Sequence, residues 1–67
     1  MIIQKKLLEK WVVLRSPEDT SKMADRLEGG YPELFARAFR TGKCSDEVFQ
    51  VMADFYKEKE ELIKQYI

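Results

Sequence analysis

The reactive side chains in this sequence are few, and their spacing forms no catalytic group. The chain has no histidine and a single cysteine, Cys44, so it lacks the commonest general base and the commonest metal ligand. A zinc site and a cysteine–histidine nucleophile both require residues that are absent here. Ser16 and Ser45 precede segments of helical character, where serine is a typical N-cap. We therefore expect that the protein is not an enzyme and uses no metal, cofactor or small-molecule substrate.

Three further features suggest reactive sites, but each has a simpler interpretation. The acids within residues 57–61 alternate with lysines, as on a solvated helix face. Gly29-Gly30 is followed by no lysine of the kind that a phosphate-binding loop requires. Cys44 follows Lys43 near the start of a helical segment, where a thiolate would be favoured. A half-buried packing residue is the interpretation of Cys44 that we prefer.

Positive and negative charges are equal in number over the whole chain, but they are concentrated in different segments. Twelve basic and twelve acidic residues give no net charge, which by itself argues against nucleic-acid binding. Basic residues are nevertheless in excess within 1–15 and 35–45, and acids are in excess within 16–34 and 46–67. The second basic segment contains no acid and has three basic residues, Arg37, Arg40 and Lys43.

Length and composition predict one small folded unit, a single helical domain over residues 1–67. Hydrophobic residues make up 45% of the chain and charged residues 36%, a balance typical of strongly amphipathic helices. The single cysteine is typical of a reducing compartment, and the short apolar runs predict neither a leader peptide nor a membrane span. We expect a cytoplasmic protein that does not bind membranes.

The spacing of apolar residues predicts an all-α fold, a compact bundle of about four helices. The expected helices cover approximately residues 3–15, 17–28, 32–41 and 46–66. In the first, apolar residues recur on one face of a 3.6-residue repeat, at Ile3, Leu7, Trp11 and Leu14. Ser16, with Asp19 three residues later, is placed to cap the second segment, and Ser45 is placed to cap the fourth. Gly29-Gly30 and Gly42 are placed to end the second and third segments.

The middle of the chain resembles the helix-turn-helix of the lambda-repressor and Cro-like (XRE-type) DNA-binding family. The similarity covers about residues 17–57. It rests on Met23-Ala24-Asp25-Arg26-Leu27, a glycine turn, Leu34-Phe35-Ala36-Arg37-Ala38-Phe39-Arg40-Thr41-Gly42-Lys43, the start Ser45-Asp46-Glu47, and Met52-Ala53-Asp54-Phe55. The chain departs from the family pattern at Tyr31-Pro32-Glu33, which replaces a polar start of the recognition helix and brings a carboxylate near the phosphates.

This resemblance implies a small sequence-specific transcriptional regulator of a bacterial or phage kind. The recognition helix, about 32–41, would enter the major groove of double-stranded DNA. Arg37 and Arg40 would contact guanine edges, while Thr41 and Lys43 would contact phosphates. Tyr31 and Lys22 are two further candidates for contacts with DNA. A single module with so few cationic contacts binds weakly, which implies a homodimer that reads two half-sites.

An alternative function is a helical protein–protein interaction module that uses the apolar side of the fourth helix and binds no DNA. The end of that segment is more apolar than so small a core requires, and it offers a dimer or partner surface at Leu62, Ile63, Tyr66 and Ile67. The same residues could instead pack within the chain on Ile2, Ile3 and Leu7. A helical domain with neither role, including one that has lost DNA binding, is the third alternative.

Overall fold

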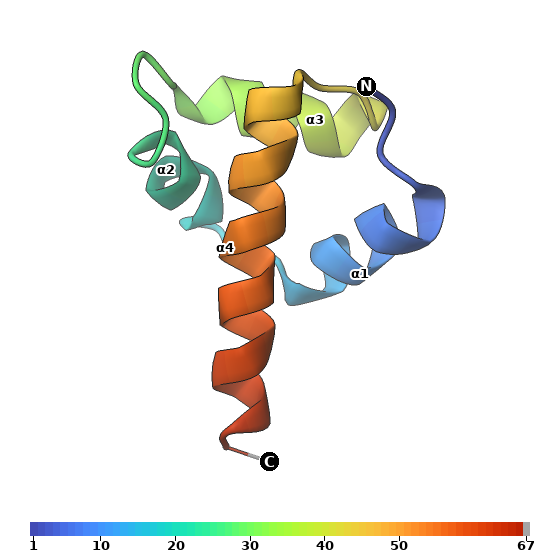
Figure 1. Ribbon diagram of the computed structural model, residues 1–67, viewed down its shortest axis with the longest axis vertical. Helices are drawn as coiled ribbons and strands as arrows, with labels where there is room; N and C mark the ends of the chain where they lie inside the picture. The colour runs from blue at the N-terminus through green and yellow to red at the C-terminus, as the bar shows by residue number, and fades with distance from the viewer. Residues whose placement is uncertain (67) are drawn as a thin grey trace.

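The computed structural model describes residues 1–66 and confirms the predicted all-α fold. Four helices are present within that range: α1 (Lys5–Leu14), α2 (Asp19–Ala24), α3 (Pro32–Thr41) and α4 (Asp46–Lys64). The longest, α4, forms the axis of the molecule, with α1 and α2 on either side of it and α3 across its N-terminal end (Figure 1). The C-terminal turns of α4 extend beyond the other helices (Figure 1).

The core is centred on the ring of Tyr56, which comes from the middle of α4 and is almost fully buried. Its ring stacks on Trp11 of α1 with 5.7 Å between the centroids. It also meets Phe39 of α3 and Phe55 edge to face, at 6.0 and 5.2 Å. Aromatic pairs in these arrangements contribute about 0.5–1.5 kcal/mol beyond the area that they bury. One residue of α4 therefore joins α1 and α3 into a single core.

Local signals in the sequence set the ends of α3 and α4 as predicted. Pro32 occupies the first turn of α3, and Gly42 ends this helix with a φ of 73°, in the left-handed region that glycine adopts without steric cost. The Ser45 hydroxyl accepts a hydrogen bond from the backbone N–H of Val48 at 3.3 Å, so it caps α4.

The first helix begins two residues later than predicted, because the residues before it pair with the α3–α4 loop. The backbone N–H of Ile3 donates to the carbonyl of Gly42 at 2.8 Å, and that of Cys44 donates to Met1 at 3.1 Å. Ile2 and Lys43 form an isolated antiparallel bridge. Hydrogen bonds to a distant loop thus replace the first helical turn that the apolar spacing suggested.

The second helix is shorter than predicted, and Ser16 is not its side-chain cap. It begins at Asp19 and ends at Ala24, after which turn hydrogen bonds carry the chain to Leu27. Gly29 then reverses the direction of the chain with a φ of 72°. The Asp19 carboxylate does accept from the Ser16 N–H at 2.8 Å, which is the contact expected of a capping acid.

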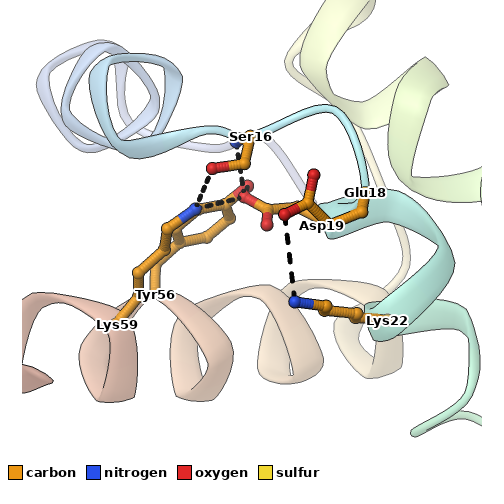
Figure 2. Close-up of polar contacts among 6 residues, drawn as sticks. All are labelled: Ser16, Glu18, Asp19, Lys22, Tyr56 and Lys59. Atoms are coloured by element: carbon orange, nitrogen blue, oxygen red, sulfur yellow. Dashed lines mark hydrogen bonds and ion pairs between the residues drawn. The ribbon is translucent and has the colours of Figure 1, made fainter.

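Asp19 also makes two long-range contacts, and these hold the α1–α2 turn against α4 (Figure 2). Its side chain is buried, with only 2% of the residue exposed. One carboxylate oxygen accepts from the Tyr56 hydroxyl at 3.0 Å and from Lys59 Nζ at 2.9 Å. Lys59 also donates to the Ser16 hydroxyl at 2.8 Å. Both donors from α4, Tyr56 and Lys59, therefore find their acceptors in the α1–α2 turn.

Burial and hydrogen bonding act in opposite directions on the pKa of Asp19. Burial alone would raise this pKa, but hydrogen bonds from Lys59, the Ser16 N–H and Tyr56 outweigh it, so the pKa lies below its usual value. Burial and the bond to Asp19 raise the pKa of the Tyr56 hydroxyl. Asp19 is therefore a carboxylate and Tyr56 a neutral donor over the physiological pH range.

We predict that Asp19→Ala lowers the free energy of unfolding by about 3 kcal/mol, since it leaves the Lys59 ammonium without its partner in a half-buried position. Urea denaturation followed by circular dichroism measures this change. Asp25→Ala is the matched control, because Asp25 is exposed at the end of α2 and its loss should change stability by less than about 0.5 kcal/mol. Equal effects of the two substitutions would contradict the role assigned to Asp19.

We also predict a specific loss of stability in acid. Because folding lowers the pKa of Asp19, its carboxylate stabilises the fold fully above the unfolded-state pKa of about 3.9, and this contribution disappears as the pH falls through the folded-state value. The difference in urea midpoint between the wild type and Asp19→Asn should therefore be constant near neutral pH and shrink below about pH 4. A difference that stays constant down to about pH 2 would exclude Asp19 as a source of the acid sensitivity.

Candidate functional site

The third helix lies across the N-terminal end of α4 with one face buried and the other open. Phe35, Ala38 and Phe39 face the core, and α3 packs against both α2 and α4. Tyr31 precedes the helix in an extended conformation and is about half exposed. Core packing therefore fixes the orientation of α3. The side chains on its outer face take no part in that packing.

Three charged residues form a strip along the outer face of α3. Glu33, Arg37 and Arg40 are spaced i, i+4 and i+7, so they lie on one side of the helix, and all three are exposed. Arg40 Nη2 donates to a carboxylate oxygen of Glu33 at 2.7 Å. Among residues 1–66, the Arg37 side chain makes no hydrogen bond or ion pair. The strip thus has one paired arginine and one arginine whose guanidinium donors face only solvent.

The neighbouring arginines favour the carboxylate form of Glu33. The hydrogen bond and the charge of Arg40 lower the pKa of Glu33 below its usual value, and the charge of Arg37 acts in the same direction. The pair is exposed to water, with 60% of the Arg40 side chain and 50% of the Glu33 side chain accessible. Water screens an exposed pair of this kind, so it contributes little to the stability of the fold.

The loop that follows α3 carries two more candidates, Thr41 and Lys43. The Thr41 hydroxyl donates to the carbonyl of Arg37 at 2.9 Å and accepts from the backbone N–H of Lys43 at 3.2 Å. This hydroxyl therefore shapes the end of the helix, and a role in phosphate binding would require it to exchange these bonds. The Lys43 side chain is exposed, and its backbone is held by the bridge to Ile2.

The pairing of Ile2 with Lys43 places the N-terminus beside the loop between α3 and α4, at one end of the molecule (Figure 1). Sequence reasoning missed this juxtaposition. The only signal for it was the apolar Ile2-Ile3 pair, of which Ile3 was assigned to the core face of the first helix.

Lys22 lies on a different surface from the other candidates. With Phe55 and Leu62 it lines an open groove of about 410 Å³ between α2 and α4, and no residue of α3 contributes to that groove. Its ammonium is 4.0 Å from the Glu18 carboxylate (Figure 2). Lys22 therefore belongs to the side of the bundle, away from the α3 strip.

The Cys44 side chain is half-buried beside the core. Burial raises the pKa of its thiol above the usual value, although the charge of the N-terminal ammonium acts in the opposite direction. The thiol form is therefore favoured, and the position supports the interpretation of Cys44 as a packing residue.

The apolar end of α4 is exposed. Leu62 is 57% and Tyr66 85% accessible, and Ile63 is also exposed. Ile67 lies outside the described residues. The N-terminal segment lies at the opposite end of α4 (Figure 1), so the alternative in which these residues pack on Ile2, Ile3 and Leu7 is not the arrangement found.

Two kinds of feature are absent from the part of the chain that the structure describes. No group of three or more cysteine, aspartate and glutamate side chains is arranged to hold a metal ion within residues 1–66. No described helix combines the length and the apolar character needed to cross a bilayer.

Comparisons with protein-family models, with curated proteins and with solved structures found no match to this chain. The similarity to the lambda-repressor and Cro-like family therefore remains a prediction from the residues that carry it. The geometry of the α3 strip and of the α4 end is the basis for any functional proposal.

Proposed function

We propose that the protein binds double-stranded DNA through the outer face of α3, as a small regulator of the helix-turn-helix type. The observation that carries this proposal is the exposed strip with Arg37 and Arg40, followed by the exposed Lys43, on a helix whose other face is held by the core. A major groove about 12 Å wide admits one α-helix. Arg37 and Arg40 would reach base edges, while Lys43 would contact a phosphate.

The link between the two helices of the motif differs from a short helix-turn-helix turn. Residues 25–31 separate α2 from α3, whereas such turns commonly have about three or four residues. Packing of Phe35 and Ala38, rather than a tight turn, therefore sets the position of α3. A recognition helix needs only a rigid support and an open outer face, and α3 has both.

The number of cationic side chains limits the affinity for DNA that this mode of binding can reach. Each phosphate contact contributes about −0.9 to the slope of log K against log salt concentration, so the single contact assigned to Lys43 gives a slope near −1. With no net charge on the chain, long-range attraction adds little. Tight binding therefore calls for a second copy on a second half-site, and we include a homodimer in the proposal.

A second candidate function is binding of a protein partner by the end of α4. The observation that favours it is the exposure of Leu62, Ile63 and Tyr66 on turns that no other helix covers (Figure 1). These residues continue the side of α4 that buries Met52, Phe55 and Tyr56 in the core. An apolar helix face of this kind is typical of a surface that enters a groove or pairs with another helix.

We predict that Arg37→Glu with Arg40→Glu reduces the affinity for duplex DNA at low salt by at least about 100-fold, because it places negative charge against the phosphates. Fluorescence anisotropy with a labelled duplex over a salt series measures this loss. Lys57→Glu with Lys64→Glu is the matched control, since it changes the net charge equally in the middle and at the end of α4. Loss of affinity in both pairs, or wild-type binding that does not change with salt, would contradict the proposal.

For the second candidate, we predict concentration-dependent association of the wild-type protein that Leu62→Lys or Ile63→Lys weakens at least about tenfold, through loss of buried apolar area. Sedimentation equilibrium over a wide concentration range measures it. Val13→Lys serves as the control, because Val13 is an exposed apolar residue on α1. A wild-type protein that stays monomeric at about millimolar concentration would rule out self-association through this surface.

A further inference from the structure

We propose that Glu33 is a specificity-determining residue, which restrains Arg40 so that this arginine reads a guanine edge instead of binding phosphates. This inference rests on the proposed DNA-binding function. It starts from the hydrogen bond of 2.7 Å between Arg40 Nη2 and the Glu33 carboxylate on the exposed face of α3.

The Glu33–Arg40 pair restrains a long side chain and does little for stability. Residues seven apart are separated by about 10.5 Å along a helix axis, so the Arg40 side chain must lie along α3 to reach Glu33. Its path follows the same side of the helix as Arg37. Water screens this exposed pair, so it adds little to folding, and its effect is to favour one conformation of a long, otherwise mobile side chain.

The restrained guanidinium keeps the donors that recognition of guanine needs. It has five N–H donors in one plane, and the bond to Glu33 uses one of them. The remaining donors suffice for the two acceptors, N7 and O6, that guanine presents in the major groove.

The Glu33 carboxylate also opposes the competing mode of binding. Any approach of the paired Arg40 to a phosphate brings this carboxylate towards the same negative charge, whereas at a base edge it can accept from a cytosine amino group. Arg37 has no such restraint among the described residues and can contact either a base edge or a phosphate. The pair therefore weakens binding to DNA of arbitrary sequence and favours a G·C pair at one position.

The test compares the wild type with Glu33→Gln, Arg40→Lys and Glu28→Gln, all as the full chain. Glu28→Gln is the matched control, since it removes one exposed carboxylate from the α2–α3 link and not from the strip. A duplex chosen by the wild type from a randomised pool, its single-base variants and a mixed-sequence duplex serve as probes. Anisotropy titrations over a salt series give the affinities, and circular dichroism checks that each variant is folded.

We expect Glu33→Gln to bind the mixed-sequence duplex at least about threefold more tightly, with a salt slope steeper by about one, because Arg40 is released to a phosphate. Discrimination at one G·C pair should fall by at least about fivefold. Arg40→Lys should lose discrimination at that same pair, since lysine keeps the charge but not the planar set of donors. Glu28→Gln should leave discrimination unchanged.

Two results would overturn the inference, and only the second would also exclude the proposed DNA binding. If Glu33→Gln tightens binding to every duplex equally and base preference is intact, Glu33 acts through charge alone while the proposed DNA binding stands. If the wild type binds no duplex even at low salt, the proposed function fails and the role of Glu33 fails with it.

Discussion

The carboxylate of Asp19 is the constraint on which the arrangement of the helices depends. A buried charge is tolerated only when it is paired and hydrogen-bonded, and Asp19 finds its donors on two separate parts of the chain. The Ser16 N–H is local, whereas Tyr56 and Lys59 belong to α4. The carboxylate is therefore satisfied only when the α1–α2 turn is docked on α4. A helix as short as α2 gains its stability from this docking, because six residues are marginal as an isolated helix.

The docking of this turn on α4 also holds the proposed recognition helix, α3, in place. Once α2 is fixed on α4, the two helices present the apolar surface that receives Phe35, Ala38 and Phe39. The outer face of α3 then has no part in folding, so stability does not explain the charged residues on it. The pairing of Arg40 with Glu33 fits this view, since an exposed pair seven residues apart adds little stability and yet orders a long side chain.

The sequence predicted the features that local physics decides. The end of α3 at Gly42 and the cap of α4 at Ser45 each depend on a few neighbouring residues, and both were confirmed. The pairing of Ile2 with Lys43 was missed, because apolar spacing alone cannot distinguish a helical turn from an extended segment on the same core. The capping contact of Asp19 was predicted, but its bonds to Tyr56 and Lys59 require the tertiary fold. The Glu33–Arg40 pair lies within one helix and was missed for another reason, since it depends on side-chain conformation.

The two candidate surfaces lie at opposite ends of α4, and this limits how they can act together (Figure 1). In an antiparallel pair of α4 ends, the two α3 helices would lie at opposite ends of the dimer, facing away from each other. They could not then enter successive major grooves on one face of a duplex, about 34 Å apart. Only roughly parallel α4 helices place both α3 helices on the same side. A dimer that reads two half-sites therefore requires parallel pairing, whereas an antiparallel one would leave each α3 to act alone.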